Sequence, residues 1–212
     1  MLQYRTIYPK TLELLRKLML LPELKDFFLV GGTSLALQLG HRISIDIDLF
    51  TQNDFDTKKL FSKLNKQFEI SDLIEDTNTL NFNILFPEKS DNIIKIDLIK
   101  YSYPLINPIF EIDKIRLLSV EDIIPMKLSA VAGRGSKKDF YDIFHLLKSY
   151  SLDKMFVLFK KKFPNTNEFH ILKSLTYFED AEIEPNPQMT EKTDWNIVKT
   201  KITKETNRYI NK

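Results

Sequence analysis

The stretch from Phe28 to Phe50, FLVGGTSLALQLGHRISIDIDLF, decides the fold. Its apolar start ends at Gly31-Gly32, a short helical pattern follows, and Gly40 stands where a helix C-terminus places glycine. From residue 44 to residue 50 polar and apolar side chains alternate, which predicts a strand with the odd-numbered residues, Ile45 among them, on the core side. We therefore predict a strand, a tight turn, a short helix and a second strand.

The composition around this stretch is that of an ordinary folded protein. The chain has 212 residues, 43% hydrophobic and 28% charged, with a net charge of +2, so contacts to nucleic acid have to come from local patches. The absence of cysteine excludes disulfides, thiolate nucleophiles and Cys-ligated metals. No apolar run has the length of a membrane span, and the first residues lack a secretory pattern. We expect a cytoplasmic protein with no membrane contact.

The strand pattern stops near Arg116, and only helical patterns follow. This change predicts an α+β fold: a mixed β-sheet with flanking helices over residues 1–116, and a helical C-terminal domain over residues 117–212. Further strands are expected at 80–86 and 93–99, helices at 8–21, 57–68, 136–150, 153–163, 168–178 and 194–209 and from residue 119 onward, and a linker at 184–187.

Three carboxylates form the first candidate site. Asp46 and Asp48 alternate on the predicted strand, so both project to one side with Cα atoms roughly 6.6 Å apart. Asp97 lies on another alternating strand and joins them if the two strands are neighbours. Hard oxygen ligands of this kind suit Mg²⁺ or Mn²⁺, and three acids would complete the ligand set of a two-metal site. The simpler interpretation of the Asp-x-Asp pair is a solvated polar face on an edge strand.

The glycines mark a second feature, because all five fall within residues 31–40 and 133–135. At the first position Gly31, Gly32, Thr33 and Ser34 open a helix, where free backbone N–H groups and two hydroxyls suit a phosphate. The alternative is that the glycines only turn the chain and Thr33 only caps the helix.

At the second glycine position, basic side chains accompany two acids. Lys127 and Arg134 lie seven residues apart, on one helix face, where they would neutralise a triphosphate. Lys138, four residues before Asp142, is an ion-pair candidate, and Asp139 is also placed to cap the following helix after Ser136.

Two other polar segments have simpler interpretations. His41 and Arg42, which precede the predicted strand at 44–50, are expected to hold their loop or meet a phosphate. The basic tail from Lys199 to Lys212 suits an RNA backbone, although such a run is more often a solvated helix face.

Three segments carry a resemblance to a known family. Residues 28–50, the segment LSVEDIIPMK at 118–127 and the segment AVAGRGSKKDFYD at 130–142 resemble, in order and at similar distances, motifs of the AbiEii/AbiGii abortive-infection nucleotidyltransferases. Residues 195–210 resemble the usual end of that family. The resemblance thus covers nearly the whole chain, most densely at the two glycine positions.

The resemblance implies a DNA-polymerase-β-like nucleotidyltransferase core and a helical C-terminal region. It also implies a bacterial toxin–antitoxin system for abortive infection and phage defence, transfer of a nucleotide from an NTP to an RNA such as tRNA, and a cognate antitoxin as partner. Nucleotidylation of a protein or a small molecule, or a non-catalytic NTP-binding module acting through a partner, are the alternatives.

The resemblance assigns residues only in part. It maps the family's lysine and late aspartate motif onto Lys127, Lys138, Asp139 and Asp142, and leaves open which acid orients Lys127. Twelve residues separate Thr33 from Asp46, more than in the general superfamily pattern, so Thr33 and Ser34 both stay candidates for the phosphate ligand.

Overall fold

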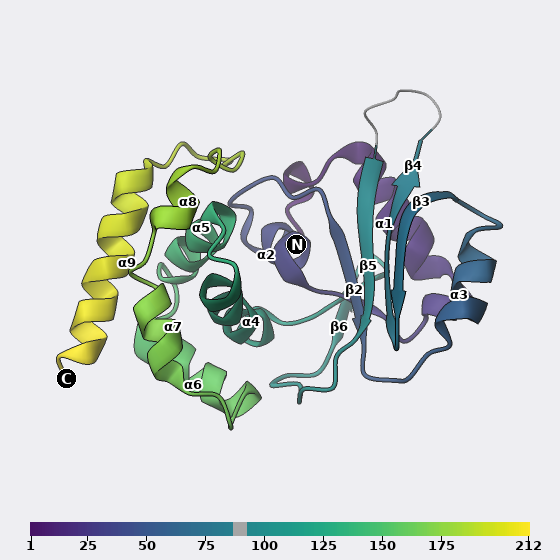
Figure 1. Cartoon of the computed structure of the whole chain (residues 1–212). Helices are drawn as coiled ribbons and strands as arrows, with labels where there is room; N and C mark the ends of the chain where they lie inside the picture. The colour runs from purple at the N-terminus through teal and green to yellow at the C-terminus, as the bar shows by residue number, and fades with distance from the viewer. Residues whose placement is uncertain (87–92) are drawn as a thin grey trace. The chain divides into compact units, whose positions relative to one another are not determined.

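The computed structural model describes residues 1–86 and 93–212 (Figure 1). The chain forms two compact units. The first comprises Met1–Gly40, Ser44–Tyr103 and Ile109–Leu118, and the second comprises His41–Ile43, Pro104–Pro108 and Ser119–Lys212. Two short segments that precede residue 117 in the sequence, His41–Ile43 and Pro104–Pro108, thus belong to the second unit.

A seven-stranded sheet forms the centre of the first unit within the described residues. Its order is β3-β4-β5-β2-β1-β7-β6. The β2–β5 and β1–β7 pairs are parallel and the others antiparallel, which confirms the predicted mixed sheet. The strands are β1 (Phe28–Leu29), β2 (Ile47–Thr51), β3 (Glu69–Asp76), β4 (Thr79–Leu85), β5 (Ile93–Lys100), β6 (Phe110–Ile112) and β7 (Ile115–Leu117).

Apolar side chains on one face of this sheet build the core with the helices of the first unit. In β5 the residues Ile94, Ile96 and Leu98 are buried while their odd-numbered neighbours are more exposed, as the alternation predicts. Helix α1 crosses behind the strands in Figure 1 and contributes leucines to the same core cluster. The helical segments of this unit are η1 (Tyr4–Thr6), α1 (Pro9–Leu20), η2 (Pro22–Leu24), α2 (Gly31–Leu39) and α3 (Thr57–Leu64).

The second unit is helical in the part of the chain that the structure describes. Its helices are α4 (Val120–Gly133), α5 (Lys137–Leu146), α6 (Leu152–Lys162), α7 (Glu168–Ser174), α8 (Glu179–Glu182) and α9 (Trp195–Ile210). Ser119 caps α4 as predicted, its hydroxyl accepting a hydrogen bond from the Asp122 N–H at 3.0 Å. Phe140 and Tyr141 of α5 are fully buried, and Tyr141 stacks on Trp195 with ring centroids 5.6 Å apart, so both rings belong to the core of this unit.

The structure corrects four local predictions. Strand β2 begins only at Ile47, so Ile45 is 53% exposed and lies outside the core. The exposed edge strand β3 was missed, because it carries few buried side chains and many acids. The predicted helices at 57–68, 136–150 and 168–178 end earlier. Ser136 does not cap α5 through its side chain, because its hydroxyl donates to Glu184 instead.

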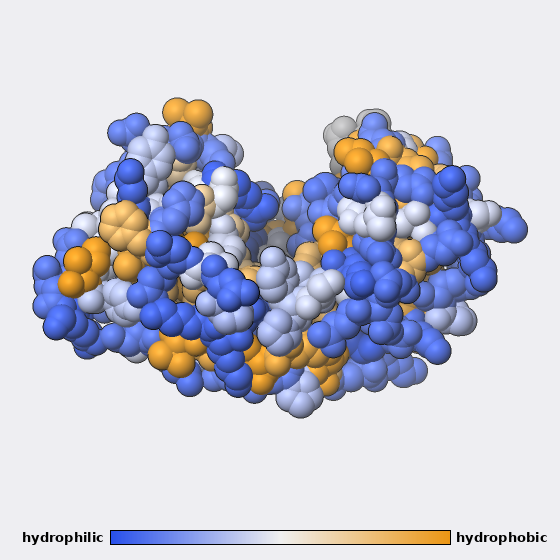
Figure 2. Space-filling model, turned by 60° about the horizontal axis from the view of Figure 1, so that its bottom comes forward, coloured by the Kyte–Doolittle hydropathy of each residue, from blue (hydrophilic) through white to orange (hydrophobic). Residues whose placement is uncertain are grey.

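The surface is mainly hydrophilic on the face drawn in Figure 2, where apolar side chains emerge in small separate groups. Within residues 1–86 and 93–212, none of the helices combines the length and the apolar character needed to cross a bilayer.

Candidate functional site

The start of α2 lies directly against the Asp48 carboxylate. Gly31 has a φ of +66°, and a Cβ added there would stand 2.2 Å from Asp48 Oδ2. Only glycine fits both the backbone conformation and the space. Val30, the N-cap residue of α2, forms no side-chain cap hydrogen bond. A helix N-terminus and a carboxylate therefore lie in one place in the first unit.

Thr33 and Ser34 are both buried. The Thr33 hydroxyl contacts the main-chain carbonyl of Asp46 and lies 2.9 Å from Ser44 Oγ. Ser34 Oγ accepts a hydrogen bond from Gln38 Nε2 at 3.1 Å. Thr33 thus holds the segment that carries the acids, and the choice between the two hydroxyls as phosphate ligand stays open.

The three predicted acids lie on neighbouring strands or just before them. Strand β2 pairs with β5, and Asp48 is directly opposite Asp97 in the register, while Asp46 immediately precedes β2. Asp97 accepts hydrogen bonds from Asn81 Nδ2 at 2.8 Å and from Lys95 Nζ at 3.0 Å. The topology therefore supplies the neighbouring strands that the sequence required.

The acids create a negative potential that acts on Lys95. The hydrogen bond to Asp97 raises the pKa of Lys95, and the charges of Asp97, Asp46 and Asp48 raise it further. Among the described residues no group of three or more Asp, Glu, His or Cys side chains is already gathered at metal-binding distance. The carboxylate donors fit a hard divalent cation chemically, since such ions prefer oxygen ligands, and the potential attracts positive charge.

A buried ionic cluster occupies the second unit. Lys127 is 4% exposed, and its Nζ lies 3.0 Å from Asp139 Oδ1 and 2.6 Å from Asp142 Oδ2. Arg134, which is exposed, binds Asp139 through Nε at 2.7 Å and Nη2 at 2.9 Å. Both acids therefore contact Lys127, and the division of roles between them stays a prediction. Lys138 lies half-buried in the first turn of α5.

Asp142 has two further partners that the sequence analysis did not assign to it. The Arg42 guanidinium donates through Nε to Oδ1 at 2.7 Å and through Nη2 to Oδ2 at 2.9 Å. His41 Nε2 lies 2.7 Å from Oδ1. These residues hold their loop, as expected, but they do so through an acid about 100 positions away, and no local spacing signals such a contact.

Charge compensation keeps both buried acids ionised. Burial raises the pKa of Asp142, but the charges of Arg42 and Lys127 and the hydrogen bonds from Arg42 and His41 outweigh it and hold the pKa well below its usual range. Burial likewise raises the pKa of Asp139, and the charges of Lys127 and Arg134 reverse the shift. The cluster is therefore an alternating chain of cations and carboxylates.

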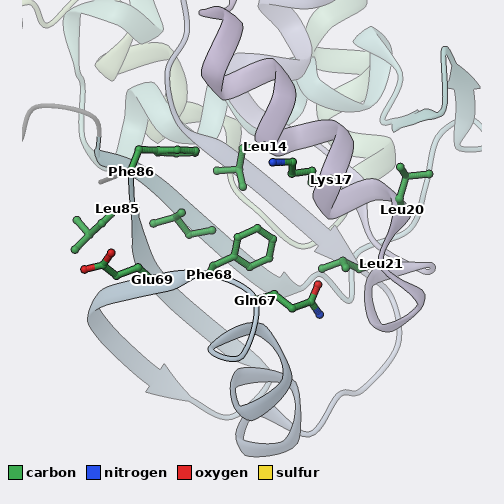
Figure 3. Close-up of a pocket in the computed structure, with 10 residues that line it drawn as sticks. Leu14, Lys17, Leu20, Leu21, Gln67, Phe68, Glu69, Leu85 and Phe86 are labelled. Carbon is green, nitrogen blue, oxygen red and sulfur yellow. The ribbon is translucent and has the colours of Figure 1, made fainter. Parts of the chain in front are cut away.

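A separate apolar cavity of about 550 Å³ lies in the first unit (Figure 3). Leu14, Lys17 and Leu21 from α1 and its C-terminal flank line it, together with Phe68 before β3 and Phe86 after β4. None of the predicted site residues is among its lining residues, so this cavity is not the candidate site.

Comparisons with solved structures identify the fold. The chain is similar to JHP933 from Helicobacter pylori, with a TM-score of 0.60, 16% identity and coverage of 95% of this chain and 92% of that one. It is also similar to MenT4, a nucleotidyltransferase toxin from Mycobacterium tuberculosis H37Rv, with a TM-score of 0.60, 14% identity and coverage of 91% and 82%. The fold is that of a polymerase-β-like nucleotidyltransferase.

The family follows from the sequence comparison. The model of the family described as "Nucleotidyl transferase AbiEii toxin, Type IV TA system" matches residues 13–208, and the chain belongs to this family. A relative from Aquifex aeolicus (strain VF5), "Uncharacterized protein aq_aa25", is 38% identical over 178 residues, which cover 81% of this chain and 83% of the relative. The predicted family is thus confirmed, and family and fold together support a nucleotidyltransferase toxin.

Proposed function

We propose that this protein is a Mg²⁺-dependent or Mn²⁺-dependent nucleotidyltransferase toxin that transfers a nucleotide from an NTP to an RNA, with tRNA as the first acceptor to test. The observation that carries the proposal is the pairing of Asp48 with Asp97 on neighbouring strands, with the glycine start of α2 against Asp48. This arrangement puts carboxylates and a helix N-terminus, the groups that bind a metal-complexed phosphate, in one place.

In the proposed reaction the acceptor hydroxyl oxygen forms a bond to the α-phosphorus of the NTP. The bond between the α-phosphorus and the bridging oxygen breaks, pyrophosphate leaves, and the hydroxyl proton passes to solvent. A divalent metal, when bound by Asp46, Asp48 and Asp97, supplies neutralisation of phosphate charge and activation of the hydroxyl. The backbone from Gly31 to Ser34 orients the phosphates.

The proposal also gives roles to the basic residues that the sequence singled out. Lys127 and Arg134 stabilise the charge that develops on the triphosphate, and Asp139 and Asp142 hold Lys127 in place. Lys138 is the other cation that the family motif assigns to the nucleotide. In the basic tail, four of the five basic side chains pair with an acid in the structure: Lys199, Lys201, Arg208 and Lys212.

The acceptor class is tested by incubating the purified protein with MgCl₂, each α-labelled NTP in turn and total cellular RNA. A labelled band of tRNA size that RNase removes and protease leaves is the expected result. Label that resists RNase and disappears with protease identifies a protein acceptor and contradicts the RNA proposal. The type IV family also implies an antitoxin partner, which co-expression should reveal as restored growth.

A further inference from the structure

The segment His41–Ile43 belongs to the second unit and is fixed there by its backbone. The Ile43 N–H donates to the Gln188 carbonyl at 2.8 Å, and the Thr190 N–H donates to the His41 carbonyl at 3.0 Å. Arg42 forms an antiparallel bridge with Met189 between these bonds. Arg42 is 3% exposed, and its guanidinium reaches the ionic cluster from a backbone that these bonds hold in place.

The guanidinium fixes the plane of the Asp142 carboxylate. Two parallel N–H donors reach the two oxygens, a fork geometry that restricts rotation of the carboxylate. One of these oxygens, Oδ2, is also the atom that lies 2.6 Å from Lys127 Nζ. The orientation that Arg42 imposes therefore decides where Asp142 presents its oxygen to Lys127.

We infer that Arg42 is a positioning residue, which holds Lys127 in place through Asp142. This inference rests on the proposed function, in which Lys127 stabilises phosphate charge. The cluster is a chain of Arg42, Asp142, Lys127, Asp139 and Arg134, with a cation at each end.

A second buried pair in the same unit shows what a purely structural pair looks like. Asp122 binds Lys162 at 2.7 Å, and its other partners include the backbone N–H groups of Ile106 and Asn107. That carboxylate anchors a chain segment. The side-chain partners of Asp142 include the cations Arg42 and Lys127 and the imidazole of His41, so its contacts bear on the placement of other side chains.

Amine labelling tests the inference without any need for turnover. Wild type, Arg42→Ala and Arg42→Lys are treated with an acylating reagent, and modification of each lysine is followed by mass spectrometry. Lys162, which is fully buried in the same unit, is the internal reference. We expect Lys127 to react about tenfold faster in Arg42→Ala and about threefold faster in Arg42→Lys, while Lys162 changes less than about twofold.

Arg116→Lys is the matched control, because Arg116 donates to the carbonyls of Met19, Leu24 and Phe27 in the first unit and should leave Lys127 protected. Unchanged protection of Lys127 in folded Arg42→Lys, or an equal rise at Lys127 and Lys162, overturns the inference. In the transfer reaction, Arg42→Ala should lower kcat with KM for the NTP nearly unchanged, and methylguanidinium should restore part of kcat. Wild-type inactivity would count against the proposed function and leave the labelling test intact.

Discussion

Gly31 shows at the scale of one residue why the glycine pair matters. Its backbone is left-handed, and the Asp48 carboxylate fills the space that a side chain needs. Gly31→Ala is expected to cost about 1–2 kcal/mol in strain and to displace Asp48, with a loss of transfer activity of about 100-fold. Thermal unfolding and initial rates measure the two effects.

Gly133→Ala is the control, because nothing lies within 4 Å of that position and its φ is ordinary. Equal activity in both variants would contradict the assignment.

Lys95 provides a second prediction at this scale. Its ammonium lies 3.0 Å from Asp97 Oδ2 and interacts electrostatically with Asp46 and Asp48, so it competes with any cation that binds these three acids. Lys95→Gln should therefore bind Mn²⁺ about three- to fivefold more tightly, as measured by electron paramagnetic resonance of the free ion. Lys100→Gln, on the same strand but paired with Asp54, should leave the affinity unchanged. Weaker Mn²⁺ binding by Lys95→Gln would count against a metal site at these acids.

At the scale of elements, a buried ion pair ties the segment Pro104–Pro108 to the second unit. Lys162 donates to the Pro104 carbonyl at 2.9 Å and to Asp122 Oδ1 at 2.7 Å, and both side chains are fully buried. Lys162→Met leaves the Asp122 charge without its buried cation, so the free energy of unfolding should fall by about 3–5 kcal/mol in urea titrations. Lys17→Met breaks the exposed pair with Glu13 and should have no measurable effect. Similar losses in the two variants would refute this account.

Helices and strands could be predicted from the sequence where burial of one face makes apolar residues recur at a regular spacing. In strands β4 and β5 buried side chains alternate with less buried ones, and α2 ends at a left-handed Gly40, so each has a local signal. Strand β3 is an exposed edge strand rich in acids. It pairs with β4, but none of its side chains is buried, so its sequence shows no alternation of apolar and polar residues. Ile45 was wrongly predicted to face the core, because the alternation in the sequence starts before the first residue of strand β2.

The candidate site was only partly predictable, for a reason that belongs to the whole molecule. Asp46, Asp48 and the glycine pair lie on one continuous stretch, Asp97 lies on a second alternating strand, and the resemblance to a family mapped the later lysine and aspartate residues. The contact of Arg42 with Asp142 joins residues 100 positions apart, and a pattern of local spacing carries no information about it. The resemblance left open which of Asp139 and Asp142 orients Lys127, and in the structure both carboxylates lie within 3.0 Å of its ammonium.

Stability of the whole molecule should depend on pH through His145. Burial lowers the pKa of His145 to about 4, and the charges of His41 and Lys148 lower it too, whereas Asp142 opposes the shift. The unfolded chain therefore binds a proton below pH 6.5 that the folded chain binds only near pH 4. The contribution is complete above pH 6.5 and is lost as the pH falls toward 4.

Urea titrations at several pH values measure this dependence. His145→Gln should flatten the fall in unfolding free energy across the window from pH 6.5 to 4. His170→Gln, at an exposed position, should keep the wild-type slope. An unchanged slope in His145→Gln would show that another group causes the dependence.

We propose above that nucleotidyl transfer takes place at Asp46, Asp48 and Asp97 of the first unit. The most direct measurement incubates RNA with NTP labelled either at the α-phosphate or at the γ-phosphate, in wild type, Asp48→Asn and the matched surface variant Asp54→Asn. We predict that the RNA gains α-label but no γ-label, that Asp48→Asn loses at least about 100-fold of the rate, and that Asp54→Asn keeps it. Transfer of γ-label, or full activity in folded Asp48→Asn, would contradict the account.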